Sequence, residues 1–200
     1  MNRSPIEKKC VFGSLLCLIT FFSFSQEIGI RGGFNAATTG GDSENIGWKP
    51  DYHIGVYYAD EFNGGIRYFL STTYSRQGGQ VDRDLVDDWK INHNYINFGT
   101  LLGFEFTERW VVLAGPKLGI KLNGRADYPG FLDGNISESL SALNLSAATE
   151  LHHEVSDNLS IYLGYSHGLT SNVAANNPVP GRFPDRFFQL GLRGSLIQLQ

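Results

Sequence analysis

Seven charged residues share the polar face of segments in which apolar and polar residues alternate. They are Arg31, Arg67, Lys117, Lys121, Arg193, Glu105 and Glu150. Charges taken out of water are stable only when they are paired or remain hydrated. Facing one another in a narrow space, these side chains would form a structural network of ion pairs or, as the alternative, a small selective gate. We expect the structural network, in which water, loop carboxylates or a bound anion offset the three surplus positive charges.

A catalytic arrangement is less well supported. Ser166 and His167 are adjacent, and His93 lies in another segment. A hydrolase needs its base within hydrogen-bond reach of the nucleophile, whereas neighbours on one strand point to opposite faces. We therefore expect no enzymatic activity and no catalytic residues, with a lipid-modifying enzyme as the alternative. Residues 29–33 are rich in glycine, but no helix pattern follows, so they do not form a phosphate-binding loop.

No metal or cofactor site is expected either. Residues 81–88 carry four aspartates, and hard cations bind such oxygen ligands. The segment lacks the glycine and glutamate spacing of a calcium loop, so we interpret it as a solvated loop, with weak divalent-cation binding at the lipopolysaccharide surface as the alternative. His152 and His153 point to opposite faces of a strand and cannot chelate one ion together. We expect them to be ordinary residues at a strand end.

The segments that must position these residues alternate with connections of two lengths. Between residues 27 and 196 eight strand-like stretches are joined by long and short connections in strict alternation. The long connections are 37–51, 78–94, 123–139 and 169–186, and the short ones are 60–63, 107–109 and 156–158. This pattern is typical of an outer-membrane β-barrel with long extracellular loops and short periplasmic turns. The sequence predicts an all-β, antiparallel, eight-stranded up-and-down barrel.

The two faces of each strand follow from the alternation. In residues 94–106, Phe98, Leu102 and Phe104 would face outward while Asn97 and Gly103 face inward. A soluble lipocalin-like barrel would invert these faces. Small residues on the polar face and aromatic residues at the strand ends favour the membrane barrel. The expected aromatic belts are Tyr58, Phe104, Phe106 and Trp110 at one end, and Phe34, Tyr52, Tyr74, Tyr165 and Phe188 at the other.

Residues 1–25 resemble a secretory signal peptide, because basic residues precede an apolar run over 11–24. Both cysteines, Cys10 and Cys17, fall inside this segment, and a lipoprotein cut at Cys17 is the alternative. Removing the segment takes away three basic residues and one acidic residue, which leaves 13 basic and 19 acidic residues and a net charge of −6. This balance argues against a nucleic-acid partner. Residues 26–200 then form one barrel domain in the cell outer membrane.

Three segments resemble the PorT-like outer-membrane β-barrel family of Bacteroidota. They are Glu27-Ile-Gly-Ile-Arg-Gly-Gly-Phe-Asn35, Leu163-Gly-Tyr-Ser-His-Gly168 and Phe187-Phe-Gln-Leu-Gly-Leu-Arg193. The resemblance implies an eight-stranded outer-membrane barrel and supplies no catalytic motif. The chain departs from many outer-membrane proteins in ending without a terminal aromatic residue, so an assembly signal would lie near residues 187–196.

We therefore expect a non-enzymatic, monomeric outer-membrane barrel with a structural, surface-interaction or small-pore role. An accessory subunit of an outer-membrane secretion system is the alternative. Expected partners are outer-membrane lipid, lipopolysaccharide and a surface or secretion-machinery protein. Since Glu105 and Glu150 would point into the same space as the bases, Glu105→Ala is expected to lower stability by a few kcal/mol, as a broken buried ion pair does.

Overall fold

The computed structural model describes residues 26–39, 46–62, 65–81, 89–127, 134–173 and 184–199, so the predicted signal peptide lies outside the described residues. Within the described residues, short strands β2 (Ile46–Gly47) and β7 (Gly134–Asn135) and the 3-10 turn η1 (Ser137–Ser139) lie between longer elements. The long strands are β1 (Gln26–Thr39), β3 (Lys49–Phe62), β4 (Ile66–Val81), β5 (Trp89–Thr107), β6 (Trp110–Asp127), β8 (Leu143–Ser156), β9 (Leu159–Gly168) and β10 (Asp185–Leu199).

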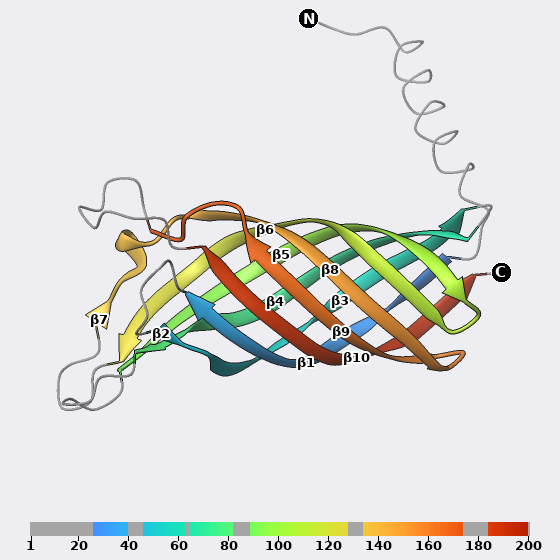
Figure 1. The fold of residues 1–200 in the computed structure, drawn as a ribbon, viewed down its shortest axis with the longest axis horizontal. Helices are drawn as coiled ribbons and strands as arrows, with labels where there is room; N and C mark the ends of the chain where they lie inside the picture. Colours follow the sequence, from blue (N-terminus) through green and yellow to red (C-terminus); the bar gives the residue numbers. More distant parts are fainter. Residues whose placement is uncertain are drawn as a thin grey trace, which may run out of the picture.

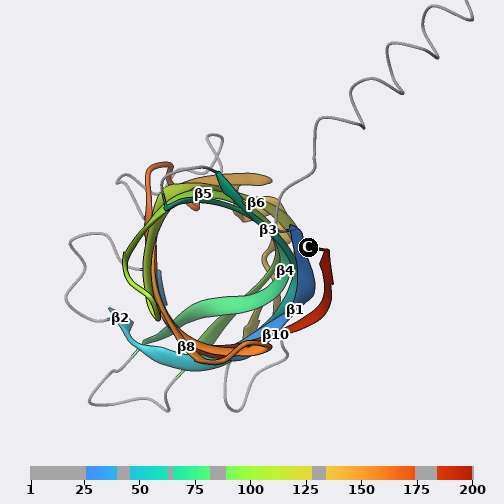
Figure 2. The same ribbon diagram turned by 90° about the vertical axis from the view of Figure 1, so that its right-hand side faces the viewer.

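These eight long strands form a closed antiparallel barrel, seen end-on in Figure 2. Each long strand pairs with the next one along the chain, and β1 pairs with β10 to close the ring, with Arg31 opposite Arg193. The predicted up-and-down eight-stranded fold is confirmed. Figure 1 shows the tight turns at one end of the barrel and β2 and β7 at the other. We call these the short-turn end and the long-connection end.

The strands extend further toward the long-connection end than the sequence predicted. Residues 78–94 were expected to be a connection, yet β4 continues to Val81 and β5 begins at Trp89. The two strands pair throughout this extension, with Gln77 opposite His93. Polar residues continue the ladder here because backbone pairing does not require apolar side chains. The barrel wall therefore rises beyond the segment with lipid-like alternation.

The outward face is apolar and the alternation predicted for the strands is confirmed. Burial alternates residue by residue along β6 and β9, and Leu102 and Leu163 are 59% and 53% exposed. Aromatic side chains lie on this face at both ends. At the long-connection end the ring of Phe188 lies 5.4 Å from that of Trp48 and 4.8 Å from that of Tyr165. Exposed Phe104, Phe106 and Trp110 lie near the short-turn end.

The interior contains an apolar layer that the sequence pattern did not predict. It is made of Tyr57, Ala59, Phe69, Leu101, Val111, Leu113 and Ala148, all buried. The rings of Tyr57 and Phe69 stack with centroids 5.3 Å apart. Gly29 makes room for this layer, because a Cβ there would lie 2.6 Å from the Tyr57 ring. The expectation of a uniformly polar or small inward face is therefore wrong: the lumen has an apolar core of its own.

The strands, and not a helix, cross the membrane. Among the residues that the structure describes, none forms a helix long and apolar enough to cross a bilayer. Tyr74 of β4 lies at the long-connection end of the apolar face and pairs with Ile96 of β5. From Ile96 to the aromatic residues near the short turns, β5 has about 9 to 11 residues, which is the length that a tilted strand needs to cross the hydrocarbon. Residues 89–95 of β5 therefore lie beyond that segment.

Candidate functional site

A group of charged side chains meets in the middle of the lumen. Arg31 of β1, Lys117 of β6, and Glu150 and His152 of β8 make up what we call the central cluster. Glu150 Oε1 accepts from Arg31 Nη2 at 3.1 Å and from Lys117 Nζ at 2.9 Å, while Oε2 accepts from His152 Nε2 at 2.8 Å. The side chains of Arg31, Glu150 and His152 are at most 1% exposed. The carboxylate therefore faces two cations from two other strands and a histidine of its own strand, without contact with water.

Small residues on neighbouring strands create the space for these long side chains. Gly164 pairs with Glu150, and a Cβ at Gly164 would lie 3.2 Å from Glu150 Cγ. Gly99 pairs with Lys117, where an added Cβ would approach Lys117 Cγ to 3.4 Å. The alternation of large charged and small residues across the lumen is what allows an eight-stranded barrel to be filled by its own side chains.

Uncharged polar residues connect the central cluster to the remaining strands. His53 Nδ1 donates to Asn35 Oδ1 at 2.7 Å, and His53 Nε2 accepts from the Tyr162 hydroxyl. Gln189 bridges the two sides, because its Oε1 accepts from Lys117 Nζ at 3.0 Å and its Nε2 donates to Asn35 Oδ1 at 3.1 Å. The cluster thus belongs to a network that crosses the whole lumen.

Aromatic rings provide the rest of the environment of Arg31. Its guanidinium lies 4.2 Å from the centroid of the Tyr162 ring and 5.3 Å from that of Phe69. Its Nη1 has no hydrogen-bond partner among the described residues. Ring faces attract a cation, and they attract it more strongly when it is desolvated. The rings therefore stabilise the part of the guanidinium that Glu150 does not reach.

A second group, the short-turn cluster, is formed by Arg67, Glu61, Glu105 and Glu154 near the short turns. Arg67 pairs with Glu154 through Nη1, with Glu105 at 3.1 Å and with Glu61 at 3.7 Å. Its side chain is 18% exposed, and that of Glu105 is 21% exposed. Arg67, Glu61 and Glu154 line a cavity of about 160 Å³. Unlike the central cluster, the short-turn cluster is in contact with water.

Arg193 lies between the two groups. Its Nη1 is 3.2 Å from His152 Nδ1, and its Nη2 is 3.5 Å from Glu27 and 3.8 Å from Glu154. Lys121 belongs to neither group, because its Nζ donates to the backbone carbonyls of Ser137 and Leu140 near the long connections. The seven predicted residues therefore do not form one group but lie at different levels of the barrel.

The expected surplus of three positive charges is wrong. Glu27, Glu61 and Glu154 form ion pairs with Arg67 and Arg193 in addition to those of Glu105 and Glu150. Register shifts interrupt the alternation between Ile28 and Gly29 and near Glu154, so a simple count of inward positions missed two of these acids. Glu105 also does not share the space of Glu150, since it pairs with Arg67 at the short-turn end.

The other candidate residues lie as the strand geometry requires. Ser166 is fully buried and 3.4 Å from Lys117 Nζ, whereas His167 Nδ1 is 3.2 Å from the hydroxyl of Tyr165 on the opposite face. His152 and His153 also face opposite ways, with His153 against Trp110 at 4.3 Å. His152 is not an ordinary strand-end residue, because it donates to Glu150 in the central cluster.

Metal ligands are not grouped in the part of the chain that the structure describes: no three histidine, cysteine or carboxylate side chains there are placed to hold an ion. Residues 82–88 of the aspartate-rich segment lie outside the described residues. The lumen therefore offers buried ion pairs and stacked rings, an arrangement that fills space and fixes side chains.

Comparison with solved structures supports the fold. Neisserial surface protein A (NspA) is 16% identical, with 86% of this chain and 97% of that chain covered and a TM-score of 0.54. Ail, the attachment invasion locus protein of Yersinia pestis, in complex with the heparin analogue sucrose octasulfate, is 15% identical, with 86% and 99% covered and a TM-score of 0.52. At these identities the similarity concerns the fold.

A search of curated proteins found no match. The family model described as outer membrane protein beta-barrel domain matches residues 24–174, which is most of the chain. The outward apolar face, the aromatic residues at its ends and the closed strand order agree with that match. The chain therefore belongs to the outer membrane protein β-barrel domain family, and its location is the cell outer membrane.

Proposed function

We propose that this protein is a closed outer-membrane barrel that acts through its surface and neither conducts solutes nor catalyses a reaction. The observation that carries the proposal is the central cluster. Arg31, Lys117 and Glu150 reach across the lumen from three strands and are almost fully buried. A barrel of eight strands has an interior that side chains just fill, so this cluster leaves no continuous path for a hydrated solute.

The apolar layer is a second barrier to permeation, next to the central cluster along the lumen. Phe69 belongs to this layer and also lies beneath the Arg31 guanidinium. An ion on its way through the barrel would have to leave water and displace both stacked rings and paired charges. Each step is costly because unpaired charge in a dry interior is strongly destabilised.

The absence of catalysis is part of the proposal. Ser166 contacts Lys117 inside the barrel, and His167 lies on the opposite face, so they do not form a nucleophile and base pair. We place the lipid-modifying enzyme below the non-catalytic functions for this reason. An assay of the purified barrel for phospholipase and lipid A deacylase activity should detect none above that of a Ser166→Ala variant.

Solute permeation tests the proposal directly. Liposomes that contain the folded barrel should swell in arabinose or glycine no faster than liposomes without protein. A general porin of larger strand number, reconstituted in parallel, is the positive control. Swelling at a rate that increases with the amount of this barrel would overturn the closed-lumen proposal.

We propose that the long-connection end faces outside the cell, as long loops do in this class of barrel. Cysteines placed at Asp42, Asp84, Asp133 and Asn176, all outside the described residues, should react with an impermeant thiol reagent in intact cells. Cysteine at Asn63 or Asp157, near the short turns, should react only after lysis. Equal reaction in intact cells would contradict this orientation.

We also propose that residues 1–25 are removed as a signal peptide. Mass spectrometry of the mature N-terminus tests this cleavage.

The three segments that resemble the PorT-like family support a monomeric accessory subunit of an outer-membrane secretion system as the second function. Deletion of the gene should then reduce secretion of cargo across the outer membrane, whereas a barrel that only binds surface partners would leave secretion unchanged.

A further inference from the structure

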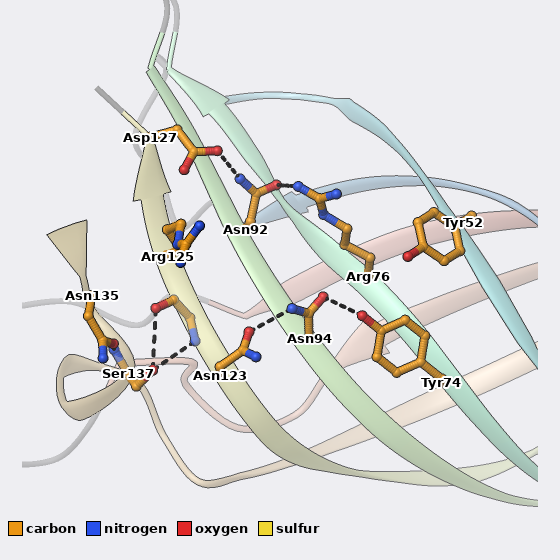
Figure 3. Close-up of a pocket in the computed structure, with 11 residues that line it drawn as sticks. Tyr52, Tyr74, Arg76, Asn92, Asn94, Asn123, Arg125, Asp127, Asn135 and Ser137 are labelled. Atoms are coloured by element: carbon orange, nitrogen blue, oxygen red, sulfur yellow. Dashed lines mark hydrogen bonds between the residues drawn. The ribbon is translucent and has the colours of Figure 1, made fainter. Parts of the chain in front are cut away.

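A polar groove of about 560 Å³ lies on the outside of the barrel wall near the long connections. Figure 3 shows its side chains on the neighbouring strands β3, β4, β5 and β6, with Asn135 and Ser137 from the following segment at one edge. The groove lies on the part of the wall that extends beyond the lipid-like alternation. It is separate from the charged groups of the lumen.

The strand register places the groove on the outward face. Arg76 pairs with Asn94, and Asn94 pairs with Asn123 across the next strand. Their neighbours Ser75 and Tyr95 are buried inside the barrel. Since successive residues of a strand point to opposite faces, Arg76, Asn94 and Asn123 point away from the lumen.

Hydrogen bonds hold the amide side chains of the groove in place. Asn94 Oδ1 accepts from the Tyr74 hydroxyl at 3.0 Å, and its Nδ2 donates to Asn123 Oδ1 at 2.6 Å. Asn92 accepts from Arg76 Nη2 at 3.0 Å and donates to Asp127 at 2.6 Å. Oriented amides beside tyrosine rings offer donors, acceptors and a flat apolar surface, which suits the hydroxyl groups and ring faces of a sugar.

The charges of the groove favour an anionic sugar. Arg125 is exposed and forms no ion pair with another described residue. The Arg76 side chain is 39% exposed, although its Nε lies 3.5 Å from Asp51. Guanidinium groups bind phosphate through paired hydrogen bonds. Two arginines against the single lining carboxylate of Asp127 leave positive charge for a phosphate group.

The same strands are apolar directly next to the groove on the bilayer side. Ile96 pairs with Ile120, Phe98 pairs with Leu118, and Leu122 is 53% exposed between Ile120 and the groove residue Asn123. A ligand that occupies the groove can therefore extend acyl chains along this outward face. That continuity favours an amphiphile of the outer leaflet over a free saccharide.

We propose that this groove binds the phosphorylated sugar headgroup of an outer-leaflet glycolipid. The amides and Tyr74 contact the sugar, Arg76 and Arg125 contact its phosphate, and Ile120 and Leu122 contact its acyl chains. The inference rests on the proposed orientation of the barrel, with the long-connection end outside. It is independent of whether the lumen conducts, so permeation measurements and the binding measurement below fail separately.

Native mass spectrometry of the full barrel released from detergent micelles can test the proposal. The probes are diphosphoryl lipid A, the same disaccharide bisphosphate without acyl chains, and phosphatidylglycerol. Wild-type protein should bind diphosphoryl lipid A at least about tenfold more tightly than either other probe, because each of them lacks one of the two contact sets. Equal binding of the acyl-free sugar would overturn the glycolipid source, and equal binding of phosphatidylglycerol would overturn the sugar headgroup.

Variants then locate the site. Arg76→Gln with Arg125→Gln should weaken lipid A binding by about tenfold or more, as loss of charged hydrogen bonds does. Arg125→Gln alone should weaken it by several-fold, and this exposed residue has no described ion pair whose loss would disturb folding. Arg109→Gln removes one positive charge, as Arg125→Gln does, from an exposed position in a short turn away from the groove. If this control weakens binding as much as the groove variants, or if the groove variants bind like wild type, the proposed site is wrong.

Discussion

The central cluster and the short-turn cluster are built from the same kinds of residue but differ in their access to water. In the centre, one carboxylate, Glu150, holds two cations and a histidine, and its side chain is 0% exposed. At the short-turn end, one cation, Arg67, is shared among three carboxylates that are 21 to 43% exposed. The first group has no second carboxylate and no contact with solvent, whereas the second group has both.

This difference decides which residues matter for stability and closure. Removal of one member of a buried ion pair leaves an uncompensated charge, which costs several kcal/mol. Removal of one member of an exposed group leaves charges that water and the remaining partners can stabilise. Loss of one residue of the central cluster should therefore destabilise the barrel strongly. Loss of one residue of the short-turn cluster should be compensated by water and by the remaining ion pairs.

Glu150→Ala should have the largest effect. It leaves Arg31 and Lys117 buried without their carboxylate, so we expect the free energy of unfolding to fall by about 3 to 5 kcal/mol. Urea titration of the barrel in lipid vesicles measures this loss. Glu138→Ala, in η1 beyond the central cluster, is a matched control that should change stability little. A loss below that of the Glu105 variant would break the distinction between the two clusters.

An arginine on the lipid face would have neither an ion-pair partner nor water around it. Leu163, in the middle of β9, is 53% exposed on the outward face. Leu163→Arg should destabilise the barrel in vesicles by about 2 to 4 kcal/mol, because this position lies near the bilayer midplane. Leu169→Arg, just beyond β9, is the control and should cost at most about 1 kcal/mol. Equal costs would mean that Leu163 does not face hydrocarbon.

His93 is a buried ionisable residue that forms no ion pair with another described residue. It lies in the extension of β5 beyond the membrane segment, where burial, and then the charges of Lys49 and Lys121, lower its pKa to about 4. Its Nδ1 accepts from Asn172 Nδ2 at 3.1 Å, which requires the neutral ring.

Because the folded-state pKa lies below the unfolded value, the unfolded chain binds the proton first as the pH falls. The resulting loss of stability is absent above pH about 6.5 and grows to about 3 kcal/mol near pH 4. Urea titrations across this pH range should show a steeper loss for wild type than for His93→Gln. Parallel pH dependences of the two proteins would show that His93 protonates as easily in the folded state as in the unfolded one.

Glu105→Ala should have the smallest effect. Arg67 keeps Glu61 and Glu154, and the group is partly solvated, so we expect a loss of about 1 kcal/mol or less. This replaces the loss of a few kcal/mol expected from the sequence, which placed Glu105 beside Glu150. The same urea titration as for Glu150→Ala makes the two values directly comparable. A loss as large as that of Glu150→Ala would show that the short-turn cluster is equally critical.

The fold could be predicted because period-2 alternation and connection length are local properties of the chain. The sequence alone placed Leu102 and Leu163 on the outward face, and the structure confirms it. Inside the barrel the same rule was less informative. It identifies inward positions, but the level at which a side chain meets another depends on strand stagger, which the alternation does not encode.

Several residues of the candidate site could not be predicted from the alternation alone. His53 and Tyr162 stand on inward positions, yet nothing in their spacing indicates that they meet across the lumen. The apolar residues Phe69 and Leu101 were missed because an inward apolar side chain disagrees with the expected polar lumen. Glu27 and Glu154 lie next to register shifts, where counting by twos fails.

Planar-bilayer recording of wild type, Glu105→Ala and Glu150→Ala under one set of conditions tests the central claim most directly. If the central cluster closes the lumen, wild type and Glu105→Ala give no steady current. Folded Glu150→Ala, in which two cations must recruit water, then gives a small current that favours anions. Large steady currents from the wild-type barrel, or currents from Glu105→Ala equal to those from Glu150→Ala, would contradict the account.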